Sequence, residues 1–154
     1  YQHSDERKLL TAFLRNAAAF GKKKKGVQFA GHNIKEFDIP YICRRLMIHQ
    51  IPVPEFLQLS GKKPWETNLT DTMQLWKFGD YKNYTSLKLL AASLGVETSK
   101  EDMDGSQVRD VYYEEKDINR IVTYCRKDVV ATAQILLRFL DLPLLPPQNI
   151  FVAD

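Results

Sequence analysis

Apolar residues recur at helical spacing along most of the chain, with polar residues on the opposite face. This periodicity is typical of amphipathic helices. Asp38 begins one predicted helix, with Pro40 in its first turn, where proline is tolerated. The remaining predicted helices span residues 5–20, 72–78, 86–94, 106–113 and 117–140, and the last of these is the longest and clearest.

Two short segments, 27–30 and 67–71, have the composition of strands. Strands that alternate with helices predict an α/β fold with a parallel pair. Two strands make a thin sheet, because parallel sheets normally contain several members and are covered on both faces. We expect one domain over residues 1–154, with an extended, proline-rich tail at 141–154.

The composition places the chain among globular proteins, since 44% of its 154 residues are hydrophobic and 27% are charged. No apolar run approaches the ~20 residues that a membrane-spanning helix needs, so we expect no membrane partner. Cys43 and Cys125 each lie inside an apolar helical pattern. Buried free thiols are expected there, which favours a reducing, cytoplasmic location. The sequence does not predict an oligomeric state.

The charge is unevenly distributed: residues 1–64 carry a net +7 and residues 65–154 a net −4. Such asymmetry steers an anionic partner or simply reflects two solvated surfaces, and we favour the second interpretation. Lys22–Lys25 are expected in a solvated loop at the opposite pole from Asp38. Exposed aromatic residues can stack on bases, but core or rim packing is favoured for Trp65, Trp76 and the tyrosines at 81, 84, 112 and 113.

Tyr124 and Asp128 are four residues apart in the long helix and therefore share one face. This pair is expected at the margin of the buried face, where a carboxylate is half shielded and still reaches a ligand. Taken alone, the pair is equally typical of an ordinary boundary tyrosine and a solvated aspartate. The predicted apolar arc comprises Ile118, Ile121, Val122, Cys125, Val129, Ala133 and Leu136.

The segment 31–38, with the sequence Gly-His-Asn-Ile-Lys-Glu-Phe-Asp, follows the end of the first predicted strand. Ligands of parallel sheets bind at that edge. Asp38 is predicted either as a functional carboxylate or as a helix N-cap, and His32 is also typical of a structural histidine. Asp71 ends the second predicted strand, and we favour the interpretation that it caps the following helix.

Together these segments resemble motifs of the DEDD superfamily of 3′-5′ exonucleases, which have a ribonuclease-H-like fold. Tyr124-x-x-x-Asp128 resembles the third motif of the tyrosine-type branch, and His32-Asn33 with Phe37-Asp38 and Pro40 resembles the second. The chain is most similar to a bacterial group related to the exonuclease domain of family B DNA polymerases. Segments 71–76 and 86–90 also resemble that group, and the likeness extends over residues 5–139.

This resemblance implies phosphodiester hydrolysis from a 3′ end by two Mg²⁺ or Mn²⁺ ions. Asp38 and Asp128 are then metal ligands and, with Tyr124 orienting the attacking water, the catalytic residues. His32, Asn33 and Phe37 are the implied nucleic-acid-binding residues, with Phe37 stacking on a base. The implied partner is a single-stranded 3′ end, with DNA favoured. No residue of the sequence indicates recognition of the 2′-hydroxyl group, which distinguishes RNA from DNA.

One departure from the family pattern is the first motif, Asp-x-Glu, which this sequence lacks. In the family this motif lies on an antiparallel three-strand unit ahead of the first helix. We therefore expect an N-terminally truncated exonuclease domain whose own activity is weak or absent. The alternatives are a non-catalytic nucleic-acid-binding domain that keeps the exonuclease fold, and a purely structural domain. The joint presence of both motifs counts against the structural domain.

Overall fold

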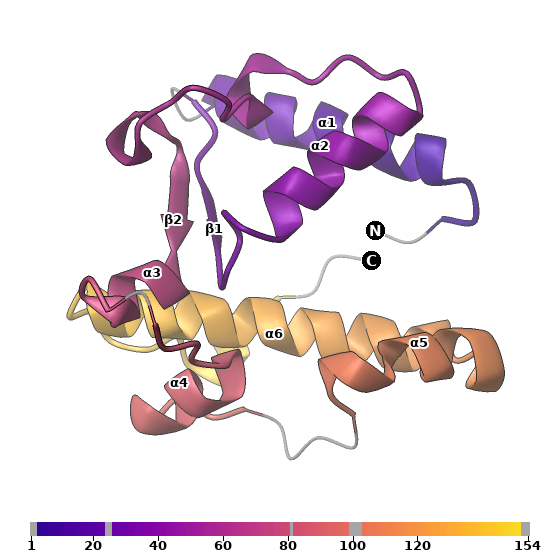
Figure 1. Cartoon of the computed structure of the whole chain (residues 1–154). Coiled ribbons are helices and arrows are strands. Elements are labelled where there is room, and N and C mark those ends of the chain that lie inside the picture. Colours follow the sequence, from indigo (N-terminus) through magenta and orange to yellow (C-terminus); the bar gives the residue numbers. More distant parts are fainter. Residues whose placement is uncertain (1–2, 24–25, 81, 99–102, 152–154) are drawn as a thin grey trace. The chain divides into compact units, whose positions relative to one another are not determined.

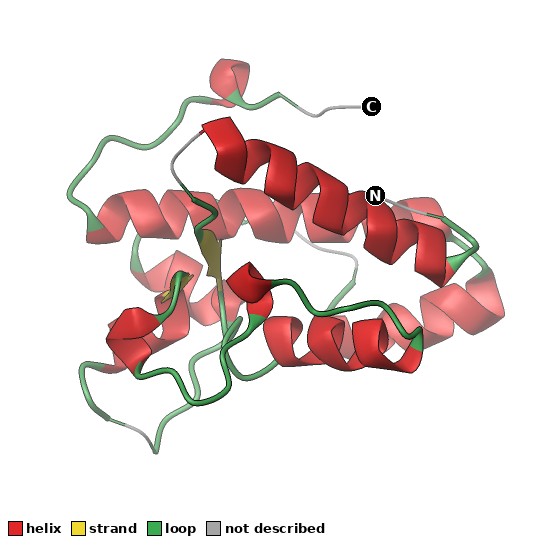
Figure 2. Ribbon diagram, turned by 90° about the horizontal axis from the view of Figure 1, so that it is seen from above, coloured by secondary structure: helices red, strands yellow, loops and turns green. Residues whose placement is uncertain are grey.

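The computed structural model describes residues 3–23, 26–80, 82–98 and 103–151, and the chain forms two compact units, Tyr1–Asp71 and Thr72–Asp154. Figures 1 and 2 show that helices dominate the chain. The only sheet in the described residues has two strands. Both strands belong to the first unit. The architecture is therefore α/β and rich in helix, as the sequence predicts.

The first unit contains two helices, α1 (Glu6–Lys23) and α2 (Asp38–Ile48), and two strands, β1 (Phe29–Gly31) and β2 (Leu69–Asp71). The strands lie side by side in parallel, with Phe29 paired to Leu69 and Gly31 to Asp71 (Figure 1). This arrangement confirms the predicted parallel pair. Two 3₁₀ turns, η1 (Glu55–Leu57) and η2 (Pro64–Glu66), interrupt the connection between α2 and β2. Because parallel strands share their carboxyl edge, Gly31 and Asp71 end at the same edge.

The helix α1 extends beyond its predicted end, since it includes Gly21 and continues to Lys23. The predicted loop at Lys22–Lys25 is thus wrong for its first two residues, and the other two lie outside the described residues. Lysine is a good helix former, and one glycine costs only about 1 kcal/mol in a helix. The N-terminus agrees with the prediction, because the Asp5 carboxylate accepts a hydrogen bond from the Lys8 amide at 3.2 Å.

The core of the first unit lies between α1, α2 and the strands. Its fully buried centre is Leu46 of α2, and three phenylalanines form a chain of tilted ring contacts, with centroids 6.2 Å and 6.1 Å apart. The buried residues are Leu10, Ile34, Ile39, Leu46, Leu57 and Leu69, and the phenylalanines are Phe13, Phe29 and Phe56. Removing a leucine such as Leu46 from this core would typically cost about 2–5 kcal/mol.

The second unit is built on the long helix α6 (Ile118–Phe139), against which α3 (Thr72–Lys77) and α4 (Leu87–Ser93) pack. Local signals set the helix boundaries as expected. Ser86 accepts a hydrogen bond from the Leu89 amide at 3.2 Å, and Asp117 accepts one from the Arg120 amide at 3.0 Å. Gly95 follows α4 with a φ of 62°, a left-handed conformation that glycine adopts without strain.

The core of the second unit is small and lies between α4 and α6. Leu90 and Ile135 are fully buried, and the rings of Trp76 and Phe139 lie 6.5 Å apart beside them. The side chain of Gln134 fixes the proline-rich tail, because it donates to the Leu145 carbonyl at 2.7 Å and accepts from the Leu145 amide at 2.9 Å. In its described part, up to residue 151, the tail has no regular secondary structure except one 3₁₀ turn, η5 (Pro147–Asn149).

The segment 106–113 departs from the single helix that its sequence predicts. It divides into a 3₁₀ turn η3 (Gly105–Gln107), a short α5 (Val108–Asp110) and a π-helical turn η4 (Val111–Glu115), which ends at Lys116 with a φ of 56°. Asp104 and Gln107 form a capping box around η3. Only Val111 of this stretch is fully buried. A regular helix here would gain little from packing, so local capping determines the conformation.

The predicted burial is wrong for Cys125, and for several aromatic residues the structure excludes the core alternative of the predicted core or rim packing. Cys125 is exposed rather than buried, whereas Cys43 is partly buried and its thiol contacts the Leu57 carbonyl at 3.5 Å; both thiols are free. Trp65 is 77% exposed and Lys63 lies over its ring, so it is not a core residue. Tyr84, Tyr112 and Tyr113 are exposed as well, and Tyr81 lies outside the described residues. Among the described helices, none is long and apolar enough to cross a membrane.

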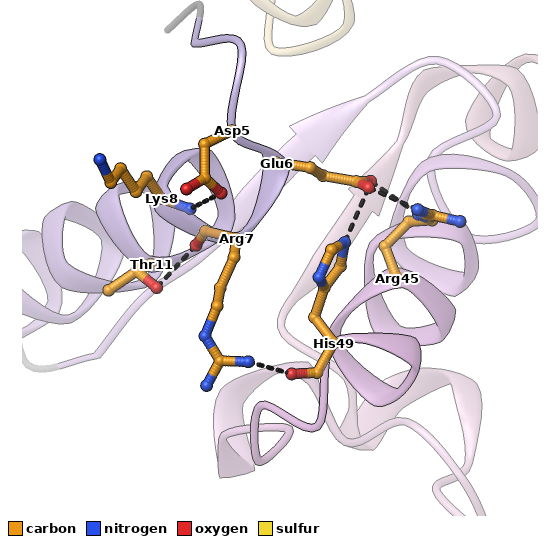
Figure 3. A network of polar contacts seen from close by, with 7 residues as sticks. All are labelled: Asp5, Glu6, Arg7, Lys8, Thr11, Arg45 and His49. Carbon is orange, nitrogen blue, oxygen red and sulfur yellow. Dashed lines mark hydrogen bonds and ion pairs between the residues drawn. The ribbon is translucent and has the colours of Figure 1, made fainter.

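A polar network joins the start of α1 to the end of α2 (Figure 3). The Glu6 carboxylate accepts hydrogen bonds from the Arg45 guanidinium, at 2.6 Å from its Nε, and contacts Nε2 of His49 at 2.8 Å. Arg7 donates to the His49 carbonyl. The hydrogen bond from Arg45, followed by that from His49, lowers the pKa of Glu6 to about 2. The charged form of Glu6 therefore stabilises the contact between the two helices.

This network predicts a pH-dependent contribution to stability. A depressed carboxyl pKa stabilises the fold above pH 4.5, the ordinary pKa of Glu6, and its effect disappears as the pH falls towards about 2. Because these side chains are about one third exposed, we expect Glu6→Gln to cost only about 0.5–1 kcal/mol at pH 7. Denaturant unfolding from pH 7 to pH 2 measures this loss. The difference in the free energy of unfolding between Glu6→Gln and wild type should shrink below pH 4.5. Glu55→Gln, at an exposed residue of the same unit, serves as the control.

Candidate active site

The loop that follows β1 is held in place by the carboxylate of Asp71, the last residue of β2. Its Oδ1 accepts a hydrogen bond from the Asn33 amide at 3.0 Å, and its Oδ2 accepts one from the Lys35 amide at 3.1 Å. Asp71 is only 2% exposed, so these bonds are shielded from water. Both oxygens of one buried carboxylate thus fix the backbone of the segment predicted to bind nucleic acid.

Two backbone features let this loop turn sharply after the strand. A Cβ atom on Gly31 would lie 2.6 Å from the side chain of Ile34, which is too close for any other residue to fit without rearrangement. Asn33 has a φ of 61°, a left-handed conformation that asparagine adopts more readily than most residues. The side-chain oxygen of Asn33 is buried without a hydrogen-bond partner, so its acceptor capacity is unused.

Asp38 lies directly after this loop, as the first residue of α2. The N-cap position belongs to Phe37, which makes no side-chain capping bond, so the predicted N-cap role of Asp38 is wrong. Asp38 is exposed as a residue, yet neighbouring atoms crowd its carboxyl group. This partial burial raises the pKa of Asp38, and the negative charge of Asp71 raises it further, whereas His32 opposes the rise. Asp71 and His32 therefore both lie close enough to Asp38 to influence its carboxyl group.

Two exposed aromatic rings accompany Asp38 on α2. Phe37 is 63% exposed and Tyr41, one turn further along the helix, is 53% exposed. Their rings are nearly parallel, with an interplanar angle of 10° and centroids 6.3 Å apart. The first unit thus brings together His32, Asn33, Phe37 and Asp38, all of which the sequence marked as candidates.

The other two candidates, Tyr124 and Asp128, are in the second unit, on α6. Both are partly buried, and the centre of the buried face continues along the same stripe through Ala131 and Ile135. The predicted apolar arc is therefore wrong, since Val129 is 69% exposed. Positions 124, 128, 131 and 135 repeat at helical spacing, which places the pair in line with the buried face rather than beside it.

The side chain of Tyr124 reaches the η3 turn. Its hydroxyl group would lie 3.7 Å from a Cβ atom built on Gly105, which is ordinary van der Waals distance. The capping box of η3 gives this turn a defined conformation, because the Asp104 side chain accepts hydrogen bonds from the amide and the hydroxyl group of Ser106 at 2.8 Å and 2.5 Å. The phenol group of Tyr124 therefore lies near a turn whose conformation is set by its own capping bonds.

The carboxylates offer hard oxygen donors, which suit Mg²⁺ or Mn²⁺ better than zinc. Asp38 belongs to the first unit and Asp128 to the second, so their shared role as metal ligands, which the family resemblance implies, stays a prediction. In the part of the chain that the structure describes, no three side chains of His, Cys, Asp or Glu gather where they would hold a metal ion. Each unit therefore supplies one candidate ligand, and the described residues of neither unit form a complete metal site.

Sequence reasoning missed two residues of this region. The sequence favours a capping role for Asp71, and it does not predict the two hydrogen bonds by which the carboxylate holds the loop after the other strand. The available signal was its position at a strand end. Tyr41 follows Phe37 by four residues, and this helical spacing is the signal in the sequence for the observed stacking of the two rings.

Two comparisons found no match, neither among curated proteins nor among solved structures. A comparison with protein-family models places the chain in a class of nucleases. The matching model describes a predicted 3′-5′ exonuclease related to the exonuclease domain of PolB, and it covers residues 1–143. The chain belongs to this family, which confirms the resemblance that its motifs indicate.

The hydrogen bonds of Asp71 predict a specific effect of Asp71→Asn. An amide group has one acceptor oxygen and places an N–H₂ group against a backbone donor, so one amide of the loop loses its buried partner. We expect a loss of about 1–3 kcal/mol in the free energy of unfolding. Hydrogen exchange should become faster at the amides of Asn33 and Lys35 in particular. Asp104→Asn, at an exposed capping carboxylate, is the matched control and should leave these two amides unchanged.

Proposed function

We propose that this protein is a metal-dependent 3′-5′ exonuclease that acts on single-stranded nucleic acid, with DNA as the favoured substrate. The observation that supports this function most directly is the arrangement after β1. There Asn33, Phe37 and Asp38 follow a strand end in the family's order, on a loop held by a buried carboxylate. The family match over residues 1–143 is independent of this geometry.

Each residue of the proposed site has a distinct task. Asp38 and Asp128 would hold Mg²⁺ or Mn²⁺ through carboxylate oxygens, and Tyr124 would orient the attacking water. The bound ions would supply an activated water and stabilise the leaving oxygen. Phe37 presents an exposed ring to the terminal base, and His32 and Asn33 contact the last nucleotide. A ribonuclease-H-like fold, in a cytoplasmic protein, is part of the same proposal.

The site predicts graded effects of substitution. Asp128→Asn removes a ligand charge and should lower the rate of hydrolysis more than 100-fold, since even second-shell substitutions at metal sites cost about 10–100-fold. Tyr124→Phe should lower the rate of hydrolysis by only about 10–100-fold, because it removes an orienting hydroxyl group and leaves both carboxylates. The release of nucleotides from a 5′-labelled single strand with Mn²⁺ measures both effects. Asp110→Asn and Tyr113→Phe, at exposed residues of the same unit, serve as controls.

The 154-residue chain alone should be almost inactive, because it contains two candidate ligands of a family site that uses four carboxylates. The assay is therefore run on this chain and, where the natural reading frame is longer, on its full product. Strong digestion by the chain itself would contradict this expectation. Unchanged activity in Asp128→Asn at saturating Mg²⁺ would refute the assigned role. Binding of the strand without any hydrolysis in either protein would favour the non-catalytic alternative.

A further inference from the structure

The outer face of α2 carries an unusual stripe that the proposed chemistry does not use. Residues 37, 41, 44 and 48 lie along one side of the helix, at spacings of four, three and four, and all of them are exposed. The inner face of the same helix packs into the core through Ile39, Ile42, Cys43 and Leu46. Because the core is satisfied by that inner face, the aromatic residues of the outer face have no packing role within the first unit.

The chemistry of this stripe changes in order along the helix. Phe37 and Tyr41 present two nearly parallel, exposed rings beside Asp38. Arg44 follows one turn later as an exposed cation. The neighbouring Arg45 is paired with Glu6, whereas no ion pair joins Arg44 to a carboxylate in the described residues. Flat rings followed by an unpaired guanidinium group are the components that proteins use to bind single strands.

The dimensions of the stripe also suit a short strand. Arg44 lies seven positions after Phe37, which corresponds to about 10 Å along the helix axis. A stacked strand rises about 3.4 Å per nucleotide along its axis, so this length accommodates about three nucleotides. A strand that ends at Asp38 could therefore place successive bases on Phe37 and Tyr41 and a phosphate beside Arg44.

We propose that Tyr41 and Arg44 form a binding track for single-stranded nucleic acid, which continues from Phe37 along α2 and leads the 3′ end to Asp38. This inference rests on the proposed function for its direction, because it takes Asp38 as the end of the track. Tyr41 stacks on the base next to the terminal one, and Arg44 contacts a phosphate. The positive charge of Arg44 and of Lys35 complements the backbone of the strand.

The test measures the affinity of the full chain for a fluorescein-labelled octathymidylate, with fluorescence anisotropy as the readout. EDTA is present so that no metal-dependent turnover occurs. Tyr41→Ala should weaken binding about 10-fold or more, within the range known for base–aromatic stacking. Tyr41→Phe keeps the ring and should bind like wild type. Tyr113→Ala, at a tyrosine that is 67% exposed in the second unit, is the control and should also bind like wild type.

Arg44→Gln gives a separate readout. Loss of one phosphate contact should reduce the slope of log Kd against log salt concentration by about 0.7, the value for one contact to a single strand. Arg15→Gln makes the same change of charge at an exposed position of α1 and should leave the slope unchanged. Circular dichroism and thermal unfolding verify that all variants are folded.

Three results would overturn the track. These are wild-type affinity in Tyr41→Ala, equal losses in Tyr41→Ala and Tyr41→Phe, or an unchanged salt slope in Arg44→Gln. Sedimentation that shows a dimer dissociated by Tyr41→Ala would instead identify the stripe as a contact between two copies of the chain, and would also overturn it. The exonuclease proposal fails separately: if octathymidylate binds through Tyr41 but the full product of the natural reading frame never shortens it when Mn²⁺ is added, the track stands and the proposed activity does not.

Discussion

The carboxylate of Asp71 is the interaction on which the candidate site depends. It is buried at the end of β2, and its two oxygens accept backbone hydrogen bonds from Asn33 and Lys35 in the loop that follows β1. A buried carboxylate is costly unless hydrogen bonds compensate for its lost hydration, and these two amides provide that compensation. The same bonds fix the path of the chain into α2. Asp38 and Phe37 are therefore placed by the end of a strand that lies more than thirty residues away in the sequence.

This arrangement matters because the sheet itself is small. Two strands of three residues each provide few hydrogen bonds and little buried surface, so the helices must supply most of the core. In the first unit α1 and α2 do so through Leu10, Ile39 and Leu46, and the Glu6 network joins their ends (Figure 3). In the second unit α4 packs on α6 around Ile135. The exposed face of α2, with Phe37, Tyr41 and Arg44, remains available for a ligand because the opposite face already satisfies the core.

Local signals predicted much of the secondary structure. Ser86 and Asp117 precede their helices as hydrogen-bonded caps, Gly95 follows α4, and the parallel pairing of the two strands agrees with the order of elements. The caps and the glycine depend on residues a few positions apart. The parallel pairing of the strands depends on the order of strands and helices along the chain. The predictions failed where burial depends on distant partners. The buried stripe of α6 passes through Ala131 and Ile135 rather than Val129, and Trp65 lies on the surface.

The sequence by itself determined which family this chain belongs to and which residues are candidates for its chemistry. Motif order and residue type are properties of the chain, and the matching family confirms the resemblance drawn from them, whereas the roles of Tyr124, Asp128 and the segment from His32 to Asp38 stay predictions. Only the tertiary structure decided how Asp71 acts and which side of α2 is left exposed. An aspartate before a helix has the same local pattern whether it caps that helix or holds another strand's loop. The choice between these roles is made by atoms that come near it only when β1 and β2 pair.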